Sequence, residues 1–300
     1  MKFIFIVNPI SGKNGDKQPL IDSINARQGR FDVAVYLTKA PKDATQFVKD
    51  YCTEHPDEDV CFVACGGDGT LNEVVNGAAP FANAAVSAYP CGSGNDYIKY
   101  YGGKDYFLDI DAILEGTPCR VDVMQIGDRY AINATHFGFD SYVAAKFYEF
   151  RHKKNPYMSA VLYALIHGMK NHARIVADGE VFFDGDYSMC TICNGTHVGG
   201  SYKCAPLSSN HDGLLEMCLF KRISRIGLLT RMKSYERGTH LTDPRIKKYL
   251  VYGRAKDVDI TVPKGFYISL DGEVIQEEHI VVHNLAGGLR FVVPKGAPIK

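Results

Sequence analysis

The sequence predicts a two-domain fold of the α/β plus β class, in which an open, largely parallel α/β sheet precedes a β-sandwich. Apolar strands alternate with helical segments up to about residue 130, and short strands dominate from there to the C-terminus. The 300 residues also exceed the ~100–200 residues of one usual domain. We place the domains at 1–130 and 131–285, and leave open that the final residues, about 286–300, pack back on the first.

The composition limits the function classes. With 46% hydrophobic and 23% charged residues, the chain is typical of a soluble globular protein. Its formal net charge of zero argues against a general nucleic-acid binder. There is no apolar run of the ~18 residues that a transmembrane helix needs. The run Phe3–Val7 is too short for a signal-peptide core, so we expect a cytoplasmic protein.

The first domain is predicted from the alternation of strands and helices. Strands are expected at Lys2–Val7, Phe31–Leu37, Val60–Ala64, Ala84–Ala88 and Arg120–Ile126, and helices at Gln18–Ala26, Pro41–Tyr51, Leu71–Gly77 and Asp109–Glu115. Ligands of such sheets bind at the carboxyl ends of the strands. Glycine-rich loops that follow these strands are therefore the first candidates for a binding site.

The loop that follows Val60–Ala64 carries the strongest signal. Gly66, Gly67 and Gly69 place no side chain between backbone N–H groups and a phosphate. A carboxylate at such a site would repel the ligand unless a cation lay between them, so Asp68 points to Mg²⁺, held directly or through water. The alternative is an ordinary glycine turn in which Asp68 caps the following helix.

Two further loops leave strands at the same end of the sheet. Asn8–Lys13 offers backbone donors and the Lys13 cation to a phosphate. In Gly92–Asp96, Asn95 could donate to a phosphate or sugar oxygen and Asp96 could share the metal with Asp68. Taken alone, each loop is equally well explained as a plain turn.

Asp122 and the Asp271-Gly272-Glu273 string can each be interpreted either as structural or as part of an active site. Asp122 interrupts an apolar strand, either as an ordinary strand-edge charge or as a third acid near the cation. Asp271-Gly272-Glu273 follows the predicted strand Phe266–Leu270. It is either a hairpin turn or a turn that aims Glu273, as a general base, at a cleft between the domains.

The second domain is predicted from its short strands, including Ala173–Ala177 and Glu180–Phe183 joined by an Asp178-Gly179 hairpin turn. Within it, Lys221–Arg254 holds ten Lys/Arg residues against Glu236 and Asp243. We favour a solvated helix packed on the sandwich, with an apolar stripe at its start. The alternative is a surface that docks on an anionic membrane.

The motifs resemble those of the diacylglycerol kinase catalytic-domain family, which includes bacterial lipid kinases and sphingosine and ceramide kinases. The matching strings are N-P-x-S-G-K at Asn8–Lys13, G-G-D-G-T-L-N-E-V at Gly66–Val74, G-S-G-N-D at Gly92–Asp96, D-G-L-L-E at Asp212–Glu216, G-T-H at Gly238–His240 and D-G-E at Asp271–Glu273. The resemblance runs from Phe3 to about Val293.

This resemblance implies an α/β domain that binds ATP, a β-sandwich domain, and an active site in the cleft between them. It implies a water-bridged Mg²⁺ network around Asp68, Asp96 and Asp122. Glu273 would be the general base, supported by Asp271, and Asp212 with the Leu214 carbonyl would hold a structural Mg²⁺. The implied nucleotide-binding residues are Asn8, Ser11, Gly12, Lys13, Gly66, Gly67, Gly69, Thr70, Glu73, Gly92, Ser93, Asn95 and Lys99.

Three positions depart from the family pattern. Ser93 stands where threonine is usual, and Lys99 stands where arginine is common, which keeps the charge without a bidentate phosphate contact. His211 replaces the acid that often precedes Asp212, and this puts the structural metal site in doubt.

The expected function is an ATP- and Mg²⁺-dependent lipid kinase that converts diacylglycerol to phosphatidic acid. The expected partners are ATP and a lipid substrate at a membrane surface, without nucleic acid; a homodimer and peripheral attachment at the inner membrane surface are left open. One alternative is an NAD-kinase-type phosphotransferase, which shares the G-G-D-G-T turn. The other is a non-catalytic regulator that binds lipid or nucleotide.

Overall fold

The computed structural model describes residues 1–12 and 15–299 of the chain. They form two compact units. The first unit comprises Met1–Val123 and Ala286–Lys300, and the second comprises Met124–Leu285. Lys13, which the sequence analysis assigns to the first glycine loop, lies outside the described residues.

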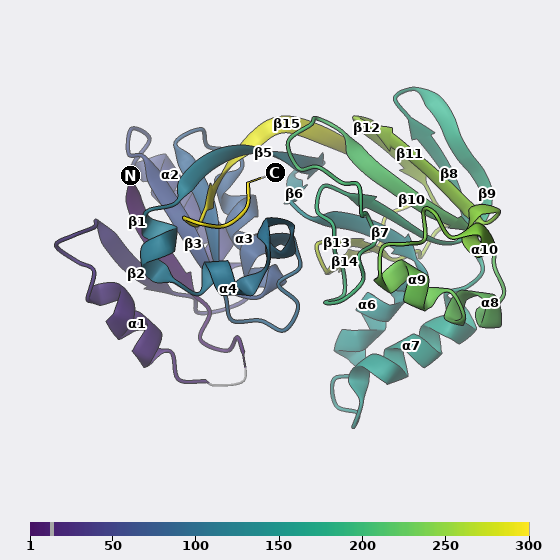
Figure 1. Cartoon of the computed structure of the whole chain (residues 1–300), viewed down its shortest axis with the longest axis horizontal. Helices are drawn as coiled ribbons and strands as arrows, with labels where there is room; N and C mark the ends of the chain where they lie inside the picture. The colour runs from purple at the N-terminus through teal and green to yellow at the C-terminus, as the bar shows by residue number, and fades with distance from the viewer. Residues whose placement is uncertain (13–14, 300) are drawn as a thin grey trace. The chain divides into compact units, whose positions relative to one another are not determined.

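A parallel sheet forms the centre of the first unit (Figure 1). Its strands β1 (Lys2–Val7), β2 (Val33–Leu37), β3 (Val60–Gly66) and β4 (Ala84–Pro90) follow the order β4-β3-β1-β2. The C-terminal part of β15 (His279–Val293) adds a parallel strand beside β4. Every residue of β3 is buried, as expected for an apolar strand covered on both faces. The predicted open, parallel α/β sheet is confirmed.

Helices connect these strands, and one of them begins earlier than the sequence suggests. The helices are α1 (Gln18–Asn25), α2 (Asp43–Glu54), α3 (Asp68–Ala78), the 3-10 helix η1 (Tyr97–Tyr101), α4 (Lys104–Phe107) and α5 (Ile110–Leu114). The helix predicted from Leu71 starts at Asp68. Asp68 therefore lies in the first turn of a helix, where a carboxylate interacts favourably with the positive end of the helix dipole.

Antiparallel strands form the sheet of the second unit. They follow the order β14 (Glu273–Ile275), β13 (Ile268–Leu270), β7 (Ala134–Gly138), β9 (Glu180–Cys193), β8 (Asn171–Ala177), β12 (Asp257–Thr261) and the N-terminal part of β15. β10 (Leu215–Lys221) pairs with β9 and with β11 (Leu250–Ala255), while β6 (Arg129–Ala131) pairs with β5 (Thr117–Ile126). The predicted β-sandwich domain is confirmed.

The hairpin between β8 and β9 has the predicted turn. Ala177 pairs with Glu180, and both intervening residues have positive φ, 49° at Asp178 and 87° at Gly179. This is the type I′ geometry that an Asp-Gly pair favours, because aspartate tolerates the left-handed region and glycine has no Cβ to clash there.

The helices of the second unit cover one side of its sheet (Figure 1). They are α6 (Phe139–Glu149), α7 (Pro156–His167), α8 (Arg225–Leu229), α9 (Met232–Glu236) and α10 (Pro244–Lys247). Within residues 1–12 and 15–299, every helix is too short or too polar to span a lipid bilayer.

The basic segment Lys221–Arg254 is not one helix with an apolar stripe, which corrects that prediction. It contains the three short helices α8, α9 and α10 and the strand β11. Leu228 packs in the core at 2% exposure, whereas Ile226 is 76% exposed. Glycine, threonine and proline in the segment favour short helices.

Candidate active site

The glycine loop after β3 lies against the loop after β4. The backbone N–H groups of Cys91 and Gly92 donate to the carbonyl of Gly66, at 2.8 and 3.2 Å. A Cβ on Gly92 would lie only 2.4 Å from the Cα of Gly67, so the two chains could not approach this closely with larger residues. Two of the three predicted loops are therefore adjacent.

The first loop joins the same group. The Asn8 amide donates to the Thr70 hydroxyl at 3.1 Å, which links the end of β1 to the first turn of α3. Gly12 has φ 79°, and a Cβ there would lie 2.7 Å from the Cys91 carbonyl oxygen. All three glycine-rich loops thus meet at the carboxyl ends of β1, β3 and β4.

One cation of this region escaped the sequence analysis. The Lys17 ammonium donates to the Ser11 carbonyl at 2.5 Å and lies near Gly12 and Cys91. Its only sequence signal is a lysine shortly after the first glycine loop.

Two carboxylates converge in this group of loops. The backbone N–H of Asp96 donates to Asp68 Oδ1 at 2.5 Å. A Cβ on Gly94 would lie 2.5 Å from Asp68 Oδ2 and 3.6 Å from Asp96 Oδ2, so an oxygen of each acid lies beside Gly94. Burial, and next the charge of Asp96, raise the pKa of Asp68 to about 6. Lys99 offsets part of this repulsion through an ion pair with Asp96 at 2.5 Å.

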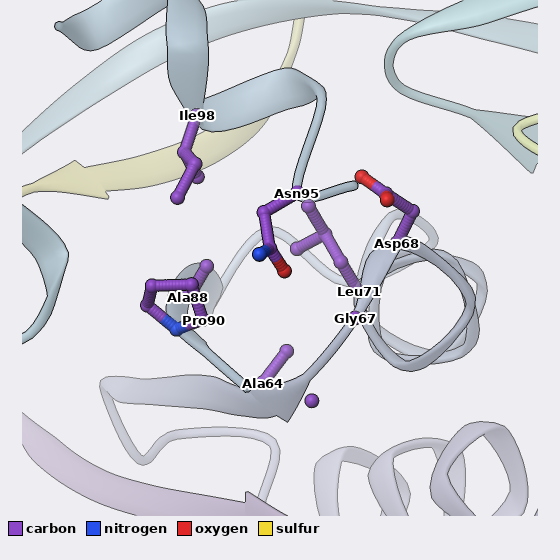
Figure 2. Close-up of a pocket in the computed structure, with 9 residues that line it drawn as sticks. Ala64, Gly67, Asp68, Leu71, Ala88, Pro90, Asn95 and Ile98 are labelled. Atoms are coloured by element: carbon purple, nitrogen blue, oxygen red, sulfur yellow. The ribbon is translucent and has the colours of Figure 1, made fainter. Parts of the chain in front are cut away.

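A small pocket lies between the second and third loops (Figure 2). Figure 2 shows the Asn95 side chain turned toward its centre, with Leu71 and Ile98 beside it. Asn95 has a left-handed φ of 47° and its amide nitrogen donates to the Gly92 carbonyl at 2.7 Å. Asn95 therefore stabilises the turn that presents Asp96.

The remaining first-unit residues predicted for the site differ in their positions. Gly69 follows Asp68 in the first turn of α3 and has open space around it, and Ser93 is exposed in the third loop. The Glu73 carbonyl accepts a hydrogen bond from Thr45 at 2.8 Å, within the α2–α3 contact. Asp122 is buried in β5, and its Oδ1 accepts the backbone N–H of Gly287 at 2.8 Å.

Two acids, Asp68 and Asp96, are the candidate ligands of a cation in this site. Over residues 1–12 and 15–299, no group of three His, Cys, Asp or Glu side chains is arranged to hold a metal. Asp68 and Asp96 nevertheless lie close together beside Gly94, and the charge of Asp96 disfavours ionisation of Asp68, which a divalent cation would relieve. These two carboxylates are the residues that would hold Mg²⁺ here, either directly or through water.

In the second unit, the D-G-E string forms the turn between β13 and β14. Asp271 and Gly272 have φ values of 49° and 96°, the geometry of a two-residue hairpin turn. The Asp271 carboxylate accepts three backbone N–H groups, from Ile132 at 2.7 Å, Asn133 at 3.0 Å and Ala134 at 2.7 Å. The turn is thereby fixed, and Glu273 begins β14 with an exposed side chain.

Asp212, predicted to hold a structural Mg²⁺ with the Leu214 carbonyl, lies beside an arginine. Asp212 forms an ion pair with Arg254, and its Oδ1 accepts the backbone N–H of Leu214 at 3.1 Å. The guanidinium group already supplies the positive charge that a metal ion would bring. The sequence alone does not reveal this role of Arg254, because the residue lies on β11, which pairs with β10 only in the folded chain.

The raised pKa of Asp68 yields a testable prediction. Without divalent cations, its carboxyl should titrate near pH 6, rather than at its ordinary value of 3.8. Because this acid is less acidic in the folded chain, its ionisation lowers stability as the pH rises across that window. We expect Mg²⁺ to lower the pKa, and Asp96→Asn to lower it without metal. Carboxyl NMR, assigned with Asp68→Asn, measures both; a midpoint near 3.8 that neither change affects contradicts the account.

Comparisons with known proteins agree with this arrangement of domains. Residues 2–126 match the diacylglycerol kinase catalytic domain, and residues 133–293 match the YegS C-terminal NAD kinase beta sandwich-like domain. The chain is similar to the diacylglycerol kinase of Bacillus subtilis (27% identical, covering 97% of this chain and 95% of the relative) and that of Staphylococcus carnosus (30% identical, 89% and 87%).

A solved structure shares the fold. A putative diacylglycerol kinase from Bacillus anthracis superposes with a TM-score of 0.77 at 22% identity, covering 99% of this chain and 98% of the other. Both domains and the sequence relatives lead to the same assignment. This chain belongs to the diacylglycerol kinase-like family of lipid kinases.

Proposed function

We propose that this kinase uses ATP and Mg²⁺ to phosphorylate a lipid hydroxyl, and that its substrate is diacylglycerol, converted to phosphatidic acid. The observation that carries the proposal is the pair of neighbouring carboxylates, Asp68 and Asp96, at the place where three glycine-rich loops meet. Similarity to two named diacylglycerol kinases supports the choice of lipid. The proposed place of action is the cytoplasmic side of a membrane, where such a substrate is found.

The loops suit the polyphosphate of a nucleotide. Backbone N–H groups at the start of α3 lie at the positive end of the helix dipole and can approach a phosphate closely where Gly67 and Gly69 carry no side chain. The cations of Lys99 and Lys17 lie in the same group of loops. Phosphoryl transfer requires mainly positioning and charge neutralisation, which these groups supply. Bound Mg²⁺ would neutralise the charge of the transferred phosphoryl group.

Glu273 is the proposed general base. Its carboxylate would accept the proton of the lipid hydroxyl while that oxygen forms a bond to the γ-phosphorus, and the bond to the β–γ bridging oxygen breaks to release ADP. Asp271 is proposed as a positioning residue, because its carboxylate accepts three backbone N–H groups and fixes the turn that presents Glu273.

A transfer assay tests the function. Labelled γ-phosphate from ATP with Mg²⁺ would be offered diacylglycerol, a sphingoid base, a total lipid extract and NAD in parallel. We expect label in phosphatidic acid. Label in another lipid would contradict the substrate, and label in NADP would contradict the lipid kinase proposal. The absence of label from every product would favour a non-catalytic regulator.

The base assignment predicts a specific loss. Glu273→Gln should lower kcat by roughly 10²–10⁴-fold, because the amide cannot accept the hydroxyl proton. ATP affinity should stay within about threefold, because the predicted nucleotide-binding residues belong to the first unit. Steady-state kinetics and equilibrium ATP binding measure the two effects. Glu278→Gln, another exposed acid nearby in the chain, serves as the control. Full turnover by Glu273→Gln would contradict the assignment.

A further inference from the structure

Helix α7 has an exposed apolar face. Met158, Leu162 and Ile166 follow one another at four-residue spacing, which places them on the same side of the helix. Their side chains are 49%, 55% and 62% exposed. The opposite side of α7 packs in the core, because Ala160 and Ala164 are fully buried. An amphipathic helix that packs one face in the core would normally carry polar residues on the other.

Helix α8 contacts the end of α7 and also has exposed apolar side chains. The Arg225 side chain donates from Nε to the Leu165 carbonyl at 2.5 Å and from Nη2 to the Ile166 carbonyl at 3.2 Å. These bonds hold the start of α8 against the end of α7, and Figure 1 shows α8 next to that end. Ile226 and Leu229 of α8 are 76% and 50% exposed. Five apolar side chains on two joined helices are therefore exposed.

The two segments that contain these helices are rich in basic residues. Residues 151–170 and 221–235 contain no Asp or Glu, in a chain whose formal net charge is zero. Some of the charge nearby is neutralised by acids outside these segments, since Arg222 forms an ion pair with Asp186 of β9 and Lys146 of α6 forms one with Glu149. The two segments carry nine Lys/Arg residues, four in the first and five in the second: Arg151, Lys153, Lys154, Lys170, Lys221, Arg222, Arg225, Arg231 and Lys233.

We propose that the α7–α8 face, defined by Met158, Leu162, Ile166, Ile226 and Leu229, docks on an anionic lipid bilayer. Apolar side chains would enter the boundary between headgroups and acyl chains, and the basic residues would lie at lipid phosphates. The inference rests on the proposed function, because a lipid kinase must reach its substrate in a membrane. A nucleic acid would match the charge alone, and an apolar protein partner would match the apolar residues alone.

The contacts of each residue determine which substitutions change the surface without disturbing the fold. Arg225 and Arg231 donate to backbone carbonyls, so reversing their charge would disturb the fold as well as the surface. The apolar residues of α7 are exposed and can become polar without leaving a cavity. Met158→Ser/Leu162→Ser/Ile166→Ser removes the α7 part of the face. Val181→Ser/Leu207→Ser is the matched control, because these residues are 54% and 64% exposed but lie outside α7 and α8.

Vesicle sedimentation measures docking without catalysis. The unmodified chain should bind phosphatidylglycerol–phosphatidylcholine vesicles and bind pure phosphatidylcholine vesicles at least tenfold more weakly, with further weakening in high salt. The triple variant should lose at least tenfold in binding to the anionic vesicles, and the control variant less than twofold. Equal binding by the triple variant overturns the proposal. So does a loss of vesicle binding that sedimentation velocity traces to a changed oligomeric state, because the face would then join two copies.

A second assay separates failure of docking from failure of the proposed function. With a short-chain diacylglycerol dispersed without a bilayer, the triple variant should transfer phosphate at the unmodified rate, because the substrate no longer lies in a membrane. A loss of transfer there would mean that the face serves the reaction itself, which contradicts a docking role. Vesicle binding that depends on the face, in a chain that phosphorylates no lipid, would support docking and reject the proposed function.

Discussion

The candidate site depends on how the Asp68 carboxylate joins two loops. Its Oδ1 accepts the backbone N–H of Asp96, and this bond ties the first turn of α3 to the turn that follows β4. Glycines make the approach feasible, since any Cβ at Gly92 or Gly94 would overlap the neighbouring chain or the Asp68 carboxylate. The consequence is electrostatic: burial and the nearby charge of Asp96 disfavour ionisation of the Asp68 carboxyl. A site with this property favours a cation.

The two units carry different parts of the proposed chemistry. In the first unit, the sheet collects loops from three strands at one edge, which is the usual position for a ligand of an open parallel sheet. In the second unit, a hairpin turn is fixed through the Asp271 carboxylate and leaves Glu273 exposed. In the proposed chemistry, Asp271 positions the turn and Glu273 transfers the proton, so the two tasks belong to different carboxylates.

Local sequence patterns predicted much of this, and tertiary contacts account for the remainder. Strand β3 was predictable because its apolar run is buried throughout, and the Asp178-Gly179 turn because both residues favour positive φ. The early start of α3 at Asp68 was not predictable, because the run of residues that favour a helix begins only at Leu71. The roles of Lys17 and Arg254 depend on partners brought close by the fold, and their sequence neighbours do not reveal them.

The most direct test of the account is the affinity for ATP, measured by titration calorimetry in Mg²⁺ and in EDTA for the unmodified chain and for Asp68→Asn. If Asp68 and Asp96 hold the cation that accompanies the nucleotide, Mg²⁺ should tighten ATP binding to the unmodified chain by at least tenfold. Asp68→Asn should lose most of that increase while its affinity in EDTA stays the same or rises, because one repelling charge is gone. An equal Mg²⁺-dependent increase in both proteins would contradict the central claim.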